Sequence, residues 1–551
     1  MKVYEVLAEA FAAEGVTDVF GMMGDANLYW IDRLAKRGVM TYEVRHENAA
    51  LNMAQGYARI SGKVGVATTT SGPGVTQLAT SMTIAARART PIVIYCGESP
   101  TGDDEYVQRI NVERFAEATE AGFIRINSAD EAVESVRKAF YQAKFESRPV
   151  ILSVPMDVQQ QTAEDDAMED YRTSSDLLRR QRPSPDPELL SQAVDIISES
   201  QRPVILVGRG AIAADAGDAV RKLAARTGAL IATTLMAKNW LNDDPFHAGI
   251  SGTYATRTAM ELFQEADLVI AVGAGLNKYT TANGYLYPGA RVIHIDPKQH
   301  VVPGSGLVQD LYLQADGKLG LEALERELAA RGCQQEGFRT GDVRARLAEQ
   351  YEDPQEYELE PGTVDPREVC RLLDKVIPSD VGLVLGSGQN VCFSTMLFNK
   401  PRDLLLPNQF FGSIGQGITS TIGAVVASGK KPAFLMDGDV SLMMYLSEFE
   451  TAVRYGLPLM VVVLNDQAMG AEYHKMRAKG LSDDLAELTT PDLGKVAEAF
   501  GGRGAKATTL DEVRAAAEAF VADPVPTILD VRISKSVISI PYRRLHFGQD
   551  A

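Results

Sequence analysis

Cysteine is scarce in this sequence, long apolar runs are missing, and acidic residues outnumber basic ones. The four cysteines lie far apart, without the paired spacing of a metal site, so we expect unpaired thiols in a reducing compartment. No apolar run approaches the roughly 18 residues that a bilayer-spanning helix needs, which argues against a membrane role. The formal charge of −18 and the lack of a basic stripe argue against a nucleic-acid partner.

A signal peptide is also missing. The opening "MKVYEVLAEAFAAEG" lacks a basic start and an apolar block, and its helical spacing predicts a first helix instead. We therefore expect a cytoplasmic protein.

Helical patterns alternate with short β-rich runs in three parts of the chain, and polar stretches separate the parts. This alternation predicts an α/β fold of three consecutive open, mainly parallel domains. We expect an N-terminal domain at 1–165, a central domain at 185–335 and a C-terminal domain at 360–551.

Two strands of the C-terminal domain end in acidic residues. "PAFLMDGDVS" stops at Asp437, Gly438 and Asp439, and "LMVVVLND" stops at Asp466. Between them, apolar residues at helical spacing predict one helix over 442–453. Because parallel strands end at the same edge of a sheet, Asp439 and Asp466 can converge there. Two adjacent carboxylates favour a cation such as Mg²⁺, with phosphate oxygens completing its shell; solvated turn aspartates are the alternative.

The segment "GDVSLMMYLSEFETAVRYGLPLMVVVLND" resembles the thiamine diphosphate (ThDP) motif of the pyruvate decarboxylase and acetohydroxyacid synthase superfamily. The resemblance extends over the whole chain. It implies that Asp439 and Asp466 bind the metal through their side chains and Ala468 through its carbonyl. Val440 replaces the usual Gly or Ala, and Asp466 replaces the second Asn of the motif.

The same resemblance implies a set of cofactor-binding residues. Gly412 stands where a carbonyl accepts from the 4′-amino group, and Ile414 stands where a stiff apolar side chain bends the cofactor. The full set is Gln389, Asn390, Gly412, Ile414, Gly438, Asp439, Val440, Ser441, Met469 and Gly470.

In the N-terminal domain, "RHENAALNMAQGYAR" followed by "TTTSGPG" is similar to the family's activating-glutamate signature. The resemblance implies that Glu47 binds the pyrimidine ring and helps the 4′-nitrogen remove the thiazolium C2 proton. A carboxylate that only complements the helix dipole is the alternative. In this family the two halves of the site come from different subunits, which implies a homodimer at least and allows a tetramer.

The substrate-facing residues are less well defined. We expect Gln77, Gln108 and Phe115 to line the pocket, although surface roles are equally compatible with them. Glu472 stands at the position of a catalytic glutamate in pyruvate decarboxylase-like enzymes, and His474 could move protons near neutral pH. A solvated helix face is the alternative for Glu472 and His474.

The central domain has two glycine-rich turns, in "VGRGAIAADAG" and "VGAGLNKYTTANG", but neither has the full dinucleotide fingerprint. The segment of FAD-binding synthases is replaced by "GLNKYTT", so FAD is not expected. We expect a ThDP- and Mg²⁺-dependent enzyme acting on small 2-oxoacids, as an acetolactate synthase-like carboligase or a decarboxylase. The alternatives are a 2-hydroxyacyl-CoA lyase and a non-catalytic, nucleotide-binding regulatory homologue.

Overall fold

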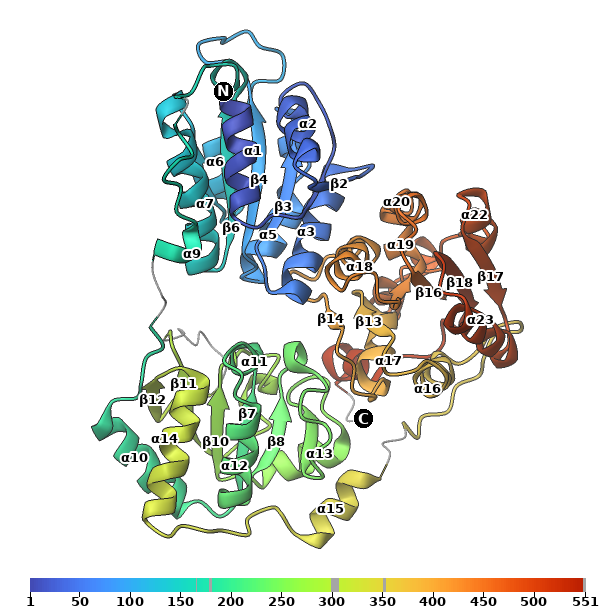
Figure 1. Cartoon of the computed structure of the whole chain (residues 1–551). Coiled ribbons are helices and arrows are strands. Elements are labelled where there is room, and N and C mark those ends of the chain that lie inside the picture. The colour runs from blue at the N-terminus through green and yellow to red at the C-terminus, as the bar shows by residue number, and fades with distance from the viewer. Residues whose placement is uncertain (165, 178–180, 299–306, 350–352, 549–551) are drawn as a thin grey trace. The chain divides into compact units, whose positions relative to one another are not determined.

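Three parallel sheets of six strands each form the framework of the computed structural model (Figure 1). The structure describes residues 1–164, 166–177, 181–298, 307–349 and 353–548. Every pairing between these strands is parallel, which confirms the predicted fold class. No helix in the described ranges is long and apolar enough to cross a membrane.

The N-terminal sheet has the strand order β2-β1-β3-β4-β6-β5. Its central strands are continuous buried runs, as expected when helices cover both faces of a parallel sheet. The strands are β1 (Asp18–Gly21), β2 (Met40–Glu43), β3 (Gly65–Thr69), β4 (Ile92–Glu98), β5 (Gly122–Arg125) and β6 (Pro149–Pro155).

The C-terminal sheet repeats this order as β14-β13-β15-β16-β18-β17. If β13 is counted as the first strand, the two sheets have the same topology. Its strands are β13 (Gly382–Leu385), β14 (Leu405–Pro407), β15 (Ala433–Gly438), β16 (Leu459–Asn465), β17 (Arg503–Ala507) and β18 (Thr527–Arg532).

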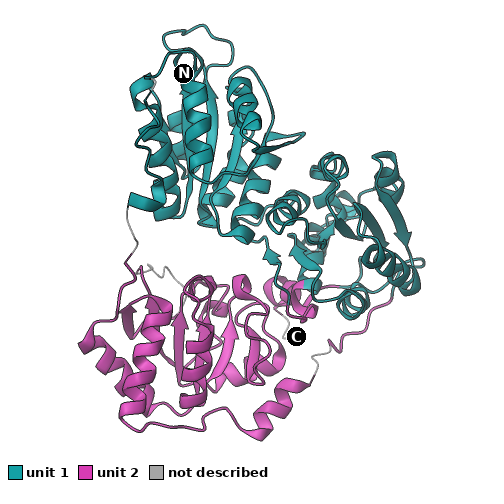
Figure 2. Ribbon diagram, in the orientation of Figure 1, with its two compact units in different colours: residues 1–179, 359–394, 402–537 teal, residues 180–358, 395–401, 538–551 magenta. Residues whose placement is uncertain are grey.

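The central sheet has a different order, β12-β11-β10-β7-β8-β9. Its strands are β7 (Pro203–Val207), β8 (Leu230–Thr233), β9 (His247–Ile250), β10 (Leu268–Val272), β11 (Arg291–Asp296) and β12 (Leu311–Gln314). It belongs to a separate compact unit of residues 180–358, 395–401 and 538–551 (Figure 2). Arg543 ties the C-terminal turn into that unit through an ion pair with Asp353, in which both side chains are buried.

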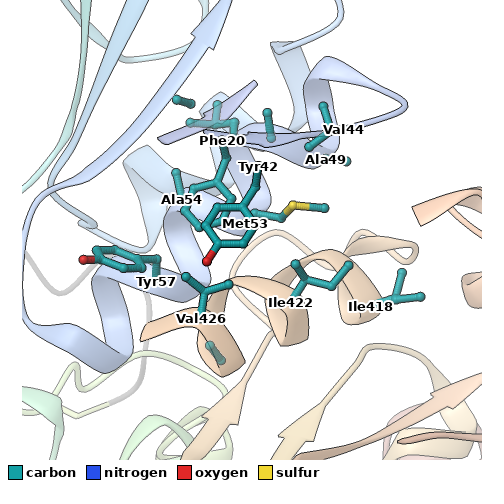
Figure 3. Close-up of a cluster of buried hydrophobic side chains, with 14 of the residues drawn as sticks. Phe20, Tyr42, Val44, Ala49, Met53, Ala54, Tyr57, Ile418, Ile422 and Val426 are labelled. Atoms are coloured by element: carbon teal, nitrogen blue, oxygen red, sulfur yellow. The ribbon is translucent and has the colours of Figure 1, made fainter. Parts of the chain in front are cut away.

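The N-terminal and C-terminal domains form the other unit and share one apolar core. Two helices dominate this contact, α3 (Glu47–Ser61) after β2 and α18 (Gln416–Ala427) after β14. Figure 3 shows Met53 from α3 near Ile418 and Ile422 from α18. The helices approach so closely that a Cβ on Gly56 would lie 2.2 Å from the Ser420 carbonyl oxygen. Glycine is required at this crossing because the two backbones touch.

Candidate active site

The carboxylates at the ends of β15 and β16 converge, as the sequence predicts. Asp439 and Asp466 are both buried, at 1% and 4% exposure. Burial raises the pKa of Asp439, and the nearby charge of Asp466 raises it further. Burial also raises the pKa of Asp466, against hydrogen bonds from Asn390 and Ala468. Two buried carboxyl groups that repel each other require a proton or a cation between them.

Two amide side chains stand at the start of α17 (Gln389–Leu397), and one of them, Asn390, contacts this pair. Asn390 Nδ2 donates to Asp466 Oδ2 at 3.0 Å and to the Leu464 carbonyl at 3.1 Å. Gln389 Nε2 donates to the Val537 carbonyl at 3.3 Å. Both amide nitrogens are therefore used within the protein. Both amide oxygens, and Asp439 Oδ2, are buried without a hydrogen-bond partner among the described residues.

These orphaned oxygens fit a bound cation. Oxygen atoms are the ligands that Mg²⁺ prefers, and Mg²⁺ commonly uses only one or two protein carboxylates. Within the described ranges, no group of three or more His, Cys, Asp or Glu side chains could hold a metal. The turn that presents Ala468 has Gln467 in the left-handed region, at φ 52°, and the Ala468 N–H donates to Asp466 Oδ1 at 3.1 Å.

Glycine 470 is needed beside the carboxylate pair. A Cβ at this position would lie 2.4 Å from Asp466 Oδ2. The residue begins α21 (Gly470–Ala478), whose N-terminus can face an anion. Met469 precedes it and is partly exposed.

Asp437, two residues before Asp439, holds the loop that contains Gly412 and Ile414 through Ser441. Ser441 Oγ donates to Asp437 Oδ2 at 2.9 Å, and the Gly415 N–H donates to Ser441 Oγ at 2.8 Å. Burial raises the pKa of Asp437 to about 7. Here the sequence reveals the acidic residue but not its role, because Gly415, which Asp437 reaches only through Ser441, is 22 positions away.

The loop before α18 brings Ile414, the predicted bending residue, close to Gly388, which precedes the predicted cofactor-binding residue Gln389. Ile414 is half-buried, and its Cγ2 lies 3.8 Å from the position of a Cβ on Gly388. Gly412 is exposed and has φ 69°, a conformation that suits glycine. Ser441 and Val440 lie in the first turn of α19 (Asp439–Met444), which begins directly after Gly438.

The predicted single helix over 442–453 is wrong. The structure has two short helices, α19 and α20 (Glu448–Arg454), interrupted at Tyr445 to Ser447. The break turns Tyr445 and Glu448 toward the N-terminal domain, where they bind the residues beside Glu47. Apolar spacing alone could not show the break, because the stripe continues across it.

Glu47 begins α3 and lies against the "SGPG" loop. Its Oε1 is 3.2 Å from the position of a Cβ on Gly74. On the same loop, Ser71 Oγ donates to Gln108 Oε1 at 2.7 Å, and a Cβ on Gly72 would lie 2.4 Å from the Gln108 carbonyl oxygen. The structure thus gathers Glu47 and Gln108 at one loop.

The other predicted substrate residues are more dispersed. Gln77 is exposed at the end of α4 (Pro73–Thr76), and Phe115 on α6 (Val112–Ala118) packs against the apolar core. Glu472 has a half-exposed side chain and pairs with Lys475 at 3.1 Å, as in the solvated-face alternative. His474 is buried, and burial lowers its pKa to about 4, so the imidazole is neutral at neutral pH.

In the central domain, the two glycine-rich turns pack against each other. The Gly208 N–H donates to the Val272 carbonyl at 3.0 Å, and the Gly210 N–H donates to the Gly273 carbonyl at 3.0 Å. A Cβ on Gly208 would lie 2.3 Å from the Gly273 oxygen. These glycines serve the close approach of two loops, and the two N–H groups are already used.

Comparison with known families agrees with this geometry. Three models of the thiamine pyrophosphate enzyme match in order: the N-terminal TPP binding domain at residues 1–118, the central domain at 190–324 and the C-terminal TPP binding domain at 386–531. Acetolactate synthase 1, chloroplastic, of Oryza sativa subsp. japonica is 30% identical over 96% of this chain and 84% of its own length. The chain belongs to the thiamine pyrophosphate enzyme family.

Two other relatives of this ThDP enzyme show the range of the similarity. The probable acetolactate synthase large subunit of Methanocaldococcus jannaschii is 28% identical over 97% of this chain and 92% of its own length. The sulfoacetaldehyde acetyltransferase of Castellaniella defragrans is 27% identical over 98% of this chain and 94% of its own length. Relatives named for different activities thus match nearly the whole chain at similar identity.

Proposed function

We propose that this ThDP enzyme binds Mg²⁺ and makes or breaks a carbon–carbon bond next to the carbonyl of a small 2-oxoacid. The observation that carries the proposal is the buried pair Asp439 and Asp466 with the unpartnered Asp439 Oδ2. Asp439, Asp466 and the Ala468 carbonyl would hold the cation. Gln389, Asn390, Ser441 and Gly470 would border the diphosphate.

Bound ThDP supplies a thiazolium carbon that becomes nucleophilic once its C2 proton has been removed. Glu47 would share a proton with the pyrimidine ring nitrogen through a hydrogen bond. Ile414 would lie against the two rings, and the Gly412 carbonyl would accept from the amino group. Glu472 and His474 remain candidates for later proton transfers; for Glu472, exclusion of water would require a further covering element.

We propose a homodimer in which Glu47 of one subunit serves the metal site of its partner. Support comes from the family resemblance and from apolar side chains that are exposed on α19 and nearby, including Met443 and Met444 at 41% and 54%. A tetramer built from such dimers is compatible with the same arrangement.

Proton–deuterium exchange at thiazolium C2 tests the enzyme proposal without knowledge of the substrate. We expect the protein with Mg²⁺ to accelerate this exchange far beyond that of ThDP in solution. If the exchange is not accelerated, the proposal that the protein is an enzyme is wrong, and the alternative of a non-catalytic regulatory homologue is favoured.

Substrate screening then separates the reactions. Release of CO₂ from 2-oxoacids, alone and with an aldehyde or a second 2-oxoacid as acceptor, supports the carboligase or decarboxylase. Release of an aldehyde from 2-hydroxyacyl-CoA thioesters with no reaction of 2-oxoacids supports the lyase. A Glu472→Gln variant that turns over every accepted substrate like the wild type removes the proposed role of Glu472.

A further inference from the structure

Glu448 is an acidic residue that the mechanism above does not use, although its side chain is completely buried. It begins α20, and its exposure is 0%. Burial of a carboxylate is costly unless several hydrogen bonds compensate it. The contacts of Glu448 therefore indicate what this carboxylate does.

Those contacts are with the turn that leads into Glu47. The Arg45 backbone N–H donates to Glu448 Oε1 at 2.9 Å, and the Arg45 and His46 N–H groups oppose the rise in pKa that burial causes. Thr451 Oγ1 donates to Oε2 at 2.8 Å and fixes the orientation of the carboxylate. One buried acid thus holds the backbone two residues before Glu47.

Tyr445, at the break between α19 and α20, holds the residue on the other side. Asn48 Nδ2 donates to the Tyr445 hydroxyl at 2.6 Å, and the His46 ring packs edge-on against the tyrosine ring at 5.5 Å. Asn48 Oδ1 in turn accepts from the Ser81 N–H at 2.9 Å. The backbone of Glu47 is therefore fixed from both sides while its own carboxylate stays available.

We propose that Glu448, assisted by Tyr445, is a positioning residue that sets the place and direction of the Glu47 carboxylate. The inference rests on the proposed role of Glu47 as the group that binds the pyrimidine ring. Hydrogen bonds to a charged acceptor are stronger than neutral ones, which makes a carboxylate suitable for fixing this stretch of backbone. An amide at position 448 offers one acceptor oxygen and places an NH₂ group against the remaining donors.

The test compares Glu448→Gln with the wild-type holoenzyme by C2 proton–deuterium exchange at saturating ThDP and Mg²⁺, and by ThDP affinity. A small displacement of a catalytic group costs up to about 100-fold in rate, so we expect exchange to fall roughly 10- to 100-fold. The ThDP Kd should change by less than about threefold, since Glu448 does not border the diphosphate. Tyr445→Phe, which keeps the ring, should give a smaller loss of exchange with the same affinity.

Glu450→Gln is the matched control. Glu450 lies on the same helix and pairs with the Arg45 side chain at 2.8 Å. Among the described residues, its carboxylate accepts no hydrogen bond from the backbone beside Glu47. This variant should exchange like the wild type.

Two results would overturn the inference. One is wild-type exchange in both Glu448→Gln and Tyr445→Phe. The other is a parallel fall of exchange, ThDP affinity and melting temperature in both variants, which would mean that the contacts only join the two domains. If instead the proposed role of Glu47 is wrong, the Glu47→Ala variant retains C2 exchange, and this result distinguishes the two cases.

Discussion

The N-terminal and C-terminal domains have the same six-strand order, yet they present different chemistry at the same places. In the C-terminal domain, β15 and β16 lead to Asp439 and Asp466. In the N-terminal domain, the equivalent β3 leads to the "SGPG" loop, and β4 ends at Glu98. The Glu98 carboxylate forms an ion pair with Arg125 at 2.9 Å, which balances its charge.

The helices after the second strand differ as well. In the N-terminal domain this helix, α3, begins with a carboxylate, Glu47; in the C-terminal domain α18 follows a loop with Gly412 and Ile414. In the proposed function, one sheet edge supplies a proton-handling acid and the other a cation site. The topology fixes where a ligand can bind, and the residues at each strand end decide what binds there.

The largest effect is expected from a substitution in the N-terminal domain. Glu47→Ala should slow C2 exchange by about 10²- to 10⁴-fold, the usual contribution of a positioned acid or base. ThDP should still bind, because the cation site is intact. Glu117→Ala, an exposed glutamate on α6, is the control. Exchange that survives in Glu47→Ala would show that the N-terminal domain does not supply the activating acid.

The next largest effect is expected from a substitution in the C-terminal domain. Asp439→Asn should weaken Mg²⁺-dependent ThDP binding at least about 10- to 100-fold. Mutation of residues that only hydrogen-bond to metal ligands already causes a loss of this size. Titration calorimetry with and without Mg²⁺ measures it, and Asp511→Asn on the exposed face of α23 (Leu510–Ala522) is the control. Unchanged Mg²⁺ dependence would argue that the buried pair shares a proton and does not bind the cation.

The crossing of the two equivalent helices gives a stability prediction. Gly56→Ala places a methyl group against the Ser420 backbone, where overpacking costs about 1–3 kcal/mol. Gly341→Ala is the matched control: its Cβ meets nothing within 4 Å, and its φ is not positive, so the change should be neutral or slightly stabilising. Denaturant unfolding compares the two, and equal stabilities would contradict the close contact of α3 and α18.

The smallest effect is a pH dependence. The pKa values of Asp439 and Asp466 are raised in the folded protein, so it binds more protons than the unfolded chain above the ordinary carboxyl range. The metal-free protein should therefore lose stability as pH rises through these raised values, by on the order of 1 kcal/mol per pH unit.

Two changes should flatten that slope. Mg²⁺ with ThDP replaces the protons, and Asp439→Asn removes the repulsion between the two charges. Melting temperatures at several pH values measure the difference between wild type and variant. The three samples are the metal-free wild type, the wild type with Mg²⁺ and ThDP, and the Asp439→Asn variant. If stability depends on pH equally in all three, the two carboxylates do not influence each other's protonation.

Sequence patterns predicted the parallel sheets because buried strands of this kind are continuous apolar runs bounded by turns. They also predicted the meeting of Asp439 and Asp466, since both follow strands that end at one edge. The break at Tyr445 and the burial of Glu448 could not be predicted. A glutamate beside an apolar stripe indicates a solvated position, and its donor at Arg45 lies 403 positions earlier. Likewise, the glycines of the central domain suggest a nucleotide site until their mutual packing is seen.

Mixing two inactive variants tests most directly whether the two domains supply complementary halves of one site. Glu47→Ala and Asp439→Asn are combined, allowed to exchange subunits and assayed for C2 exchange with Mg²⁺. If each site takes Glu47 from one subunit and Asp439 from the other, half of the mixed dimers' sites are intact, and roughly a quarter of wild-type exchange returns. If no exchange returns although mixed dimers form, the two halves are not shared between subunits in this way.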